Sequence, residues 1–275
     1  MSRLSVSHYV CPADYPIALF LAEASQIRAG AVALSVSALA EAPVRGLRAK
    51  LDDAGLRVSS LNSAGSMSYP EGPLWSDQDR RNRNLVEAAA ELGAEVLCII
   101  TGGLSVAEAS LEETRDRISE RLADLHDFAV QHGVRLGLEP IHPAELMLKG
   151  CVNSIADALA MSDEIPGLHL ILDHYHSWWD ADLLGSFTND LPRVALVQIC
   201  NLREAAPGQM VDREVLSAGQ IDCSALIRHA ERNGYNGWYE LEMFAHSLQG
   251  RRVPEVLATT AAAFAGLGVQ STKSQ

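Results

Sequence analysis

The sequence predicts an α/β protein that folds as a single closed (β/α)8 barrel. Eight short runs of apolar and β-branched residues recur along the 275-residue chain, and a longer amphipathic stretch follows each of them. A glycine stands just past several of these stretches, where a left-handed residue commonly ends a helix. The alternative is a doubly wound open sheet, but the chain has no G-x-G-x-x-G loop to support it. Eight such units in a chain of this length favour the barrel.

The predicted elements alternate in a regular order. The expected strands cover residues 3–8, 31–36, 56–62, 95–101, 134–139, 168–173, 194–200 and 238–243. The expected helices cover residues 14–29, 38–54, 77–92, 107–132, 153–163, 180–188, 222–233 and 253–267. The glycines expected to end helices are Gly30, Gly55, Gly93, Gly133 and Gly234. We expect residues 1–270 to form one domain and residues 271–275 to be a disordered tail.

Three long loops follow predicted strands, where a barrel carries its functional residues. They cover residues 63–76, 140–152 and 201–221, after the third, fifth and seventh strands. Glycine, proline and aromatic residues in these loops are typical of an ordered cover over a pocket. The sequence therefore places its candidate site at the carboxyl ends of the strands.

Composition and charge exclude several classes of protein. A net charge of −13 without any cluster of Lys and Arg argues against nucleic-acid binding. The five cysteines are scattered and form no C-x-x-C pair, so neither a disulfide framework nor a zinc knuckle is expected. No apolar run approaches the roughly 18 residues of a membrane span, and the first residues lack the apolar core of a signal peptide. We expect a cytoplasmic protein.

Four polar residues stand at or near the ends of predicted strands in the second half of the chain. They are Glu139, Asp173, Gln198 and Glu242. Because parallel strands of a barrel end at the same mouth, these side chains are expected to converge there. Carboxylate and amide oxygens are the ligands that hard divalent cations prefer, and a cation relieves the repulsion between adjacent buried carboxylates. The sequence therefore predicts a site for one divalent metal ion.

Four segments carry a resemblance to a known superfamily. They are Leu138-Glu-Pro-Ile-His-Pro143, Asp173-His-Tyr-His-Ser-Trp-Trp-Asp180, Val197-Gln-Ile-Cys-Asn201 and Gly234-Tyr-Asn-Gly-Trp-Tyr-Glu-Leu-Glu-Met-Phe244. The chain resembles the xylose-isomerase-like sugar phosphate isomerase/epimerase superfamily of TIM barrels. By this resemblance Glu139 and Glu242 are expected to bind metal and to transfer protons, and Asp173 to bind metal. His176, the histidine of the D-x-x-H motif, is expected to contact a substrate oxygen.

One position departs from the commonest pattern of that superfamily. The ligand on the seventh strand is usually histidine, and here it is Gln198; the usual aspartate three residues later is Asn201. An amide oxygen is a weaker ligand than imidazole, so the ion is expected to be Mn²⁺ or Mg²⁺. The departure also leaves open a relative that works without metal.

Further residues are candidates for contact with substrate. His142 and Trp178 lie just after the fifth and sixth strands, and Arg213 resembles an arginine of the superfamily; Arg203 competes for the same role. Lys149 and Asn153, after the fifth strand, are weaker candidates for contact with a substrate oxygen. For Lys149 an ordinary solvated lysine is the expectation, and for Asn153 a helix N-cap is the alternative.

The predicted function is a metal-dependent isomerase or epimerase of a keto-sugar or keto-polyol that works through an enediolate. A lyase that expels a β substituent from a 3-keto sugar, keto-inositol or 3-keto-glycoside would use the same groups. A DNA-repair endonuclease and a non-catalytic sugar-binding barrel are more distant alternatives. The expected partner is a small carbohydrate substrate, and no binding to nucleic acid or to a membrane is expected. A second copy of the chain is also a candidate partner, through the predicted helices 107–132 and 253–267.

Overall fold

The computed structural model contains a closed barrel of eight parallel strands, which confirms the predicted fold class. The strands are β1 (Leu4–Ser7), β2 (Ala31–Ser35), β3 (Arg57–Gly65), β4 (Ala94–Ile100), β5 (Leu136–Leu138), β6 (His169–Asp173), β7 (Val194–Ile199) and β10 (Tyr239–Leu241). Their order in the barrel is β1, β10, β7, β6, β5, β4, β3 and β2. Each overlaps the range expected for it. The structure describes residues 2–104, 110–204 and 207–269, so the predicted tail 271–275 lies outside the described residues.

Helices follow the strands in the expected alternation. The α-helices are α1 (Ile17–Gln26), α2 (Val36–Glu41), α3 (Val44–Ala54), α4 (Pro73–Leu92), α5 (Leu111–Gln131), α6 (Ile155–Glu164), α7 (His174–Ser177), α8 (Gly185–Asn189), α9 (Ser224–Arg232) and α10 (Val253–Ala265). Short 3-10 turns form at η1 (His8–Val10), η2 (Pro143–Glu145), η3 (Leu191–Arg193) and η4 (Ala245–Leu248). No helix in the described ranges is long and apolar enough to cross a membrane.

Local sequence explains where the helices differ from the expectation. The predicted helix 38–54 is two helices, because Pro43 forces the residue before it into extended backbone, and Ala42 has φ −153° and ψ 148°. Gly55 and Gly93 end α3 and α4 in the left-handed conformation, as predicted. The prediction for Gly30 is wrong, since α1 ends at Gln26 and Arg28 is the residue with positive φ. A Cβ at position 30 would lie 2.1 Å from the Ser2 carbonyl oxygen.

The expected loop 201–221 contains an antiparallel hairpin of β8 (Asn201–Arg203) and β9 (Asp212–Glu214). The Asn201 side-chain amide donates to the Leu216 and Ala218 carbonyl oxygens, and its Oδ1 accepts from the Cys223 backbone. Asn201 therefore organises the chain after the hairpin. The hairpin carries Arg213, a residue predicted to contact substrate.

The contacts divide the chain into two compact units, and the first combines Met1–Ser59 with Leu196–Gln275. In this unit Ser5, Glu240 and Gln198 stand in register on neighbouring strands. Ser59 Oγ donates to Glu240 Oε2 at 2.8 Å and lies 2.6 Å from Ser5 Oγ. Residues two apart on a strand share a face, so Glu242, just past the end of β10, is expected on the same side as Glu240.

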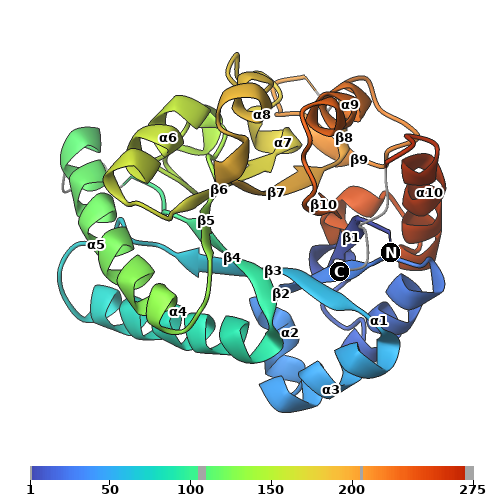
Figure 1. Cartoon of the computed structure of the whole chain (residues 1–275), viewed down its shortest axis with the longest axis horizontal. Helices are drawn as coiled ribbons and strands as arrows, with labels where there is room; N and C mark the ends of the chain where they lie inside the picture. Colours follow the sequence, from blue (N-terminus) through green and yellow to red (C-terminus); the bar gives the residue numbers. More distant parts are fainter. Residues whose placement is uncertain (1, 105–109, 205–206, 270–275) are drawn as a thin grey trace. The chain divides into compact units, whose positions relative to one another are not determined.

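The second unit is Ser60–Ala195. Its strands β4, β5 and β6 pair in parallel, and their register places fully buried leucines next to one another, such as Leu138 beside Leu170. Helix α4 packs on β4 and beside α5 (Figure 1).

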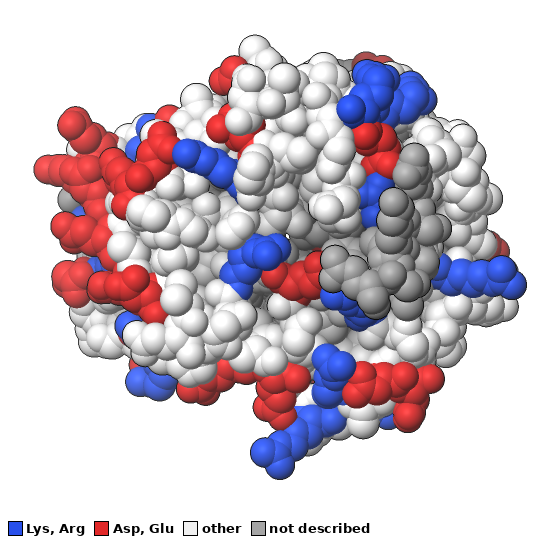
Figure 2. All heavy atoms as spheres, viewed as in Figure 1, with Lys and Arg blue, Asp and Glu red and all other residues white. Residues whose placement is uncertain are grey.

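The exposed acidic residues of α5 are Glu112, Glu113, Asp116, Glu120, Asp124 and Asp127. Acidic side chains gather over α5 at the left edge of Figure 2, and this patch contributes to the net charge of −13. The prediction that residues 1–270 form one domain stays a prediction.

Candidate metal centre

The ends of β5 and β6 hold Glu139 and Asp173 in fixed backbone positions. Glu139 follows β5, and its N–H donates to the Ile99 carbonyl oxygen of β4 at 3.1 Å. Asp173 ends β6 and caps α7, because its Oδ1 accepts from the Tyr175 N–H at 2.9 Å. The helical turn that begins there brings His176 back toward Asp173, since residues three apart share one side of a helix.

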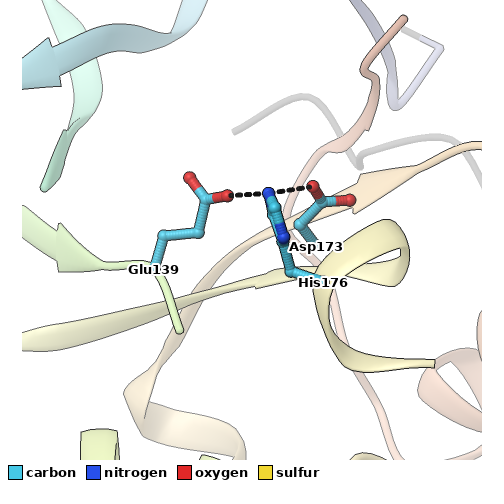
Figure 3. Close-up of side chains that lie close together, drawn as sticks. All are labelled: Glu139, Asp173 and His176. Atoms are coloured by element: carbon cyan, nitrogen blue, oxygen red, sulfur yellow. Dashed lines mark ion pairs between the residues drawn. The ribbon is translucent and has the colours of Figure 1, made fainter. Parts of the chain in front are cut away.

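Glu139, Asp173 and His176 converge as the sequence predicts for this half of the site. His176 Nε2 lies 3.7 Å from Glu139 Oε1 and 3.8 Å from Asp173 Oδ2. Figure 3 shows the imidazole between the two carboxylates. The ligand atoms of the three residues lie within 4.8 Å of one another, and each residue is at most 2% exposed.

The chemistry of this cluster fits a divalent cation. Two carboxylates buried this close repel each other, and a bound cation removes that cost. Carboxylate oxygens are established ligands of Mn²⁺, Mg²⁺ and Zn²⁺. The Cys98 thiol donates to the other oxygen of Glu139, Oε2, at 3.1 Å. This contact orients the carboxylate so that Oε1 is the oxygen directed at the cluster.

The ring of His176 is oriented by the loop after β5. Its Nδ1 accepts a hydrogen bond from the His142 backbone N–H at 3.2 Å, which directs Nε2 toward the carboxylates. Lys149, expected to be a solvated lysine, is only partly exposed, and its Nζ lies 2.9 Å from His176 Nε2. The sequence does not indicate this contact, because it joins the loop after β5 to the short helix α7 after β6.

His142 and Trp178 were predicted to contact substrate. The His142 side chain accepts from the Ala144 N–H at 3.2 Å, so it caps η2, and its ring meets Trp179 edge-on at 5.7 Å. Burial lowers the pKa of His142, although Glu145 acts in the opposite direction. Trp178 is 38% exposed. Contact of either residue with substrate stays a prediction.

In the other unit, Gln198 presents an unsatisfied buried oxygen. Its Nε2 donates to Glu240 Oε1 at 3.1 Å and to Glu242 Oε1 at 3.3 Å. These two bonds fix which end of the amide is the nitrogen. Gln198 is fully buried, and within the described part of the chain its Oε1 has no hydrogen-bond partner. A buried acceptor without a donor fits a cation ligand, as the sequence analysis expects for Gln198.

Arg213 is directed at Glu242 and is only 2% exposed. Its guanidinium pairs with Glu242 Oε2 at 2.9 Å and donates to the Glu242 carbonyl oxygen at 3.1 Å. The competing candidate Arg203 is engaged within the hairpin, where it pairs with Asp212 and Glu214. Arg213 is therefore the arginine that the structure associates with a predicted site residue, and its contact with substrate stays a prediction.

The predicted ligands thus appear as two pairs. Glu139 and Asp173 come together in one unit, and Gln198 and Glu242 come together in the other. A single ion bound by all four residues stays a prediction. Sequence reasoning did not identify Cys98, whose only sequence signal is its place on a buried strand.

Comparison with known proteins identifies the fold family. The family described as xylose isomerase-like TIM barrel matches residues 21–265. A protein of Sinorhizobium meliloti 1021 is 25% identical, with a TM-score of 0.88 over 97% of this chain and 98% of that one. No curated protein has significant sequence similarity to the chain.

Two further solved structures share the fold at lower identity. The IolI protein with a bound zinc atom is 16% identical, with a TM-score of 0.82 over 97% of this chain and 98% of that one. An L-ribulose 3-epimerase is 22% identical, with a TM-score of 0.77 over 98% of this chain and 94% of that one. At these identities the likeness concerns the fold alone.

Proposed function

The chain belongs to the xylose isomerase-like TIM barrel family, and from this premise we propose that it is a divalent-metal-dependent isomerase or epimerase. Its substrate would be a keto-sugar or keto-polyol, and the reaction would pass through an enediolate. The observation that carries the proposal is the buried cluster of Glu139, Asp173 and His176. Epimerases of L-ribulose and D-allulose among proteins of this fold support the substrate class.

One divalent ion, Mn²⁺ or Mg²⁺, is the proposed cofactor. Glu139 and Asp173 would hold it, and the predicted ligand set adds Gln198 and Glu242. The unsatisfied oxygen of Gln198 supports its inclusion. A zinc atom in the IolI protein supports a divalent ion in this fold. When bound, the ion would stabilise the negative charge that develops on the substrate oxygens.

The carboxylates would perform the proton transfers. Glu139 would remove the proton from the carbon next to the carbonyl, and Glu242 would return a proton to the intermediate. The Cys98 thiol would keep Glu139 in one orientation, and Arg213 would do the same for Glu242. His176 would contact a substrate oxygen through Nε2, because its Nδ1 is held by the His142 backbone. Return of the proton to the neighbouring carbon gives isomerisation, and return to the opposite face of the same carbon gives epimerisation.

The proposal is tested by metal-dependent hydrogen exchange. The protein is stripped with EDTA, reloaded with Mn²⁺ and incubated in D₂O with L-ribulose, D-allulose and 3-keto-glycosides. NMR spectra are then followed for deuterium next to the carbonyl. We expect Mn²⁺-dependent uptake without loss of a substituent. Loss of the β group instead would identify the lyase, and the absence of any metal-dependent uptake would contradict both reactions.

A further inference from the structure

Lys149 stands out because its ammonium lies beside His176, a member of the buried acidic cluster, and the proposed proton transfers do not use it. Its Nζ lies 2.9 Å from His176 Nε2, the same atom that faces Glu139 and Asp173. Lysine is rare in this chain, and apart from Lys149 the described residues contain only the exposed Lys50. The residues that surround Lys149 explain its position next to His176.

The backbone that carries Lys149 is held firmly by the loop after β4. Gly102 N–H donates to the Lys149 carbonyl oxygen at 3.1 Å, and Leu104 N–H donates to the Leu146 carbonyl oxygen at 2.9 Å. A Cβ at Gly103 would lie 2.6 Å from the Met147 carbonyl carbon, so the two loops are in close contact. The lysine is therefore presented from an ordered support.

The other side of the same loop is fastened as well. The Asn153 side chain donates to the carbonyl oxygens of Ile141 and Gly150 at 3.0 and 2.9 Å. Asn153 is not the N-cap of α6, because Ser154 caps that helix. Asn153 instead closes the loop that ends next to Lys149. Such a support lowers the conformational cost of holding an ammonium in one place.

At His176 the partly exposed Lys149 side chain finds no suitable protein acceptor among the described residues. A neutral imidazole has one lone pair available for hydrogen bonding, and two donors face the His176 ring. The His142 backbone N–H donates to Nδ1 at 3.2 Å, so the ring proton resides on Nε2. An ammonium beside that N–H cannot donate to it, and His176 is the only polar partner of Nζ among the described residues. The ammonium is thus positioned for an acceptor that a ligand would supply.

We propose that Lys149 contacts substrate and donates a hydrogen bond to the oxygen that becomes negatively charged in the enediolate. The inference rests on the proposed function. When a carboxylate removes the proton from carbon, the C–H electron pair forms the carbon–carbon double bond and the carbonyl π pair moves to oxygen. Lys149 keeps its proton and donates to that oxygen, so its contribution is larger in the transition state than in the ground state.

The test uses glycolohydroxamate, an anionic mimic of an enediolate, as the probe. It is titrated into the full-length Mn²⁺-loaded protein and into the Lys149→Met, Lys149→Arg and Lys50→Met variants, by calorimetry. A charge-assisted hydrogen bond of ordinary strength predicts about 30-fold weaker binding to Lys149→Met. We expect Lys149→Arg to retain most of the affinity, and Lys50→Met to bind as the wild type does. The affinity for Mn²⁺ alone should be unchanged or higher in Lys149→Met, because a positive charge near the carboxylates is removed.

The outcomes separate this inference from the proposed function. If the wild type fails to bind Mn²⁺, the proposed function and the inference both fail. If every protein binds Mn²⁺ and Lys149→Met binds glycolohydroxamate as tightly as the wild type, only the inference is overturned. If Lys149→Met loses Mn²⁺ binding or its thermal transition, or if Lys149→Arg is as weak as Lys149→Met, the residue has a structural role and the inference also fails.

Discussion

Two regions at the strand ends hold their carboxylates in contrasting ways. At the end of β10, Glu242 is paired with the buried guanidinium of Arg213 and accepts from the Gln198 amide. At the ends of β5 and β6, Glu139 and Asp173 face a shared imidazole at 3.7 and 3.8 Å, distances longer than a hydrogen bond. Glu242 thus pairs directly with a permanent positive charge, whereas Glu139 and Asp173 face an imidazole that is charged only when protonated, and the Lys149 ammonium contacts that imidazole.

This difference suggests that the two regions depend on different positive charges. A buried carboxylate with a fixed arginine beside it is stable without any ligand, so Glu242 is suited to remain in place through a catalytic cycle. Two carboxylates that converge on one point gain most from an added cation. We therefore expect metal removal to affect the β5–β6 region most, and loss of Arg213 to affect the β10 region most.

The largest expected effect comes from Glu139→Gln. This change keeps the shape of the side chain but removes both the charge that would bind metal and the base that would accept a proton. The Mn²⁺-dependent exchange rate should fall by about 10³-fold or more. Exchange is measured by NMR in D₂O, with the exposed Glu87→Gln as the matched control. A loss of less than tenfold in Glu139→Gln would mean that Glu139 is not central to the reaction.

Arg213→Met should produce the largest loss of stability. It leaves the Glu242 carboxylate buried without its arginine, which typically costs about 3–5 kcal/mol. The free energy of unfolding is measured by urea titration. The double variant Arg213→Met/Glu242→Gln removes the stranded charge and should recover part of the loss. If the single and double variants are equally unstable, the ion pair is not what stabilises this region.

Gln198→Leu tests whether the amide oxygen is a metal ligand. Leucine fills similar space but offers no oxygen, so the affinity for Mn²⁺ should decrease roughly 10- to 100-fold. Gln198→His introduces an imidazole nitrogen, a softer ligand than the amide oxygen, and should raise the preference for Zn²⁺ over Mn²⁺. Both affinities are measured by competition with a chelating dye. Equal Mn²⁺ affinity in the wild type and Gln198→Leu would remove Gln198 from the ligand set.

The smallest expected effect concerns pH. Burial lowers the pKa of His8 below its ordinary value of 6.5, with Glu41 acting in the opposite direction. Below pH 6.5 the unfolded chain therefore binds a proton that the folded chain does not, and stability decreases as the pH falls through this range. His8→Gln should show a smaller decrease in unfolding free energy between pH 7.5 and 5.5 than the wild type. An identical decrease in the wild type and in His8→Gln would show that His8 does not contribute to the pH dependence of stability.

Much of the fold follows from local sequence signals. The alternation of short apolar runs with amphipathic stretches locates the barrel strands, and Gly55 and Gly93 mark the ends of α3 and α4. The convergence of Glu139 and Asp173 also follows, because parallel strands end on the same side. These features depend on periodicity and on strand direction, and both can be read from neighbouring residues.

Other features depend on contacts between segments that are remote in sequence. The pairing of Arg213 with Glu242 requires the β8–β9 hairpin, which has no clear signal in the loop sequence. The approach of Lys149 to His176 brings together the loop after β5 and the short helix α7 after β6. Tertiary structure decides these contacts, so an exposed lysine was the better expectation from sequence alone.

We propose that the carboxylates at the strand ends bind one divalent ion, and calorimetric titration of Mn²⁺ into the EDTA-stripped wild type and into Asp173→Asn examines this site without a substrate. We expect one Mn²⁺ per chain in the wild type, and binding weaker by at least about tenfold in a folded Asp173→Asn variant. A wild type that binds no Mn²⁺, or an Asp173→Asn variant that binds it equally well, would show that these carboxylates do not form the metal site.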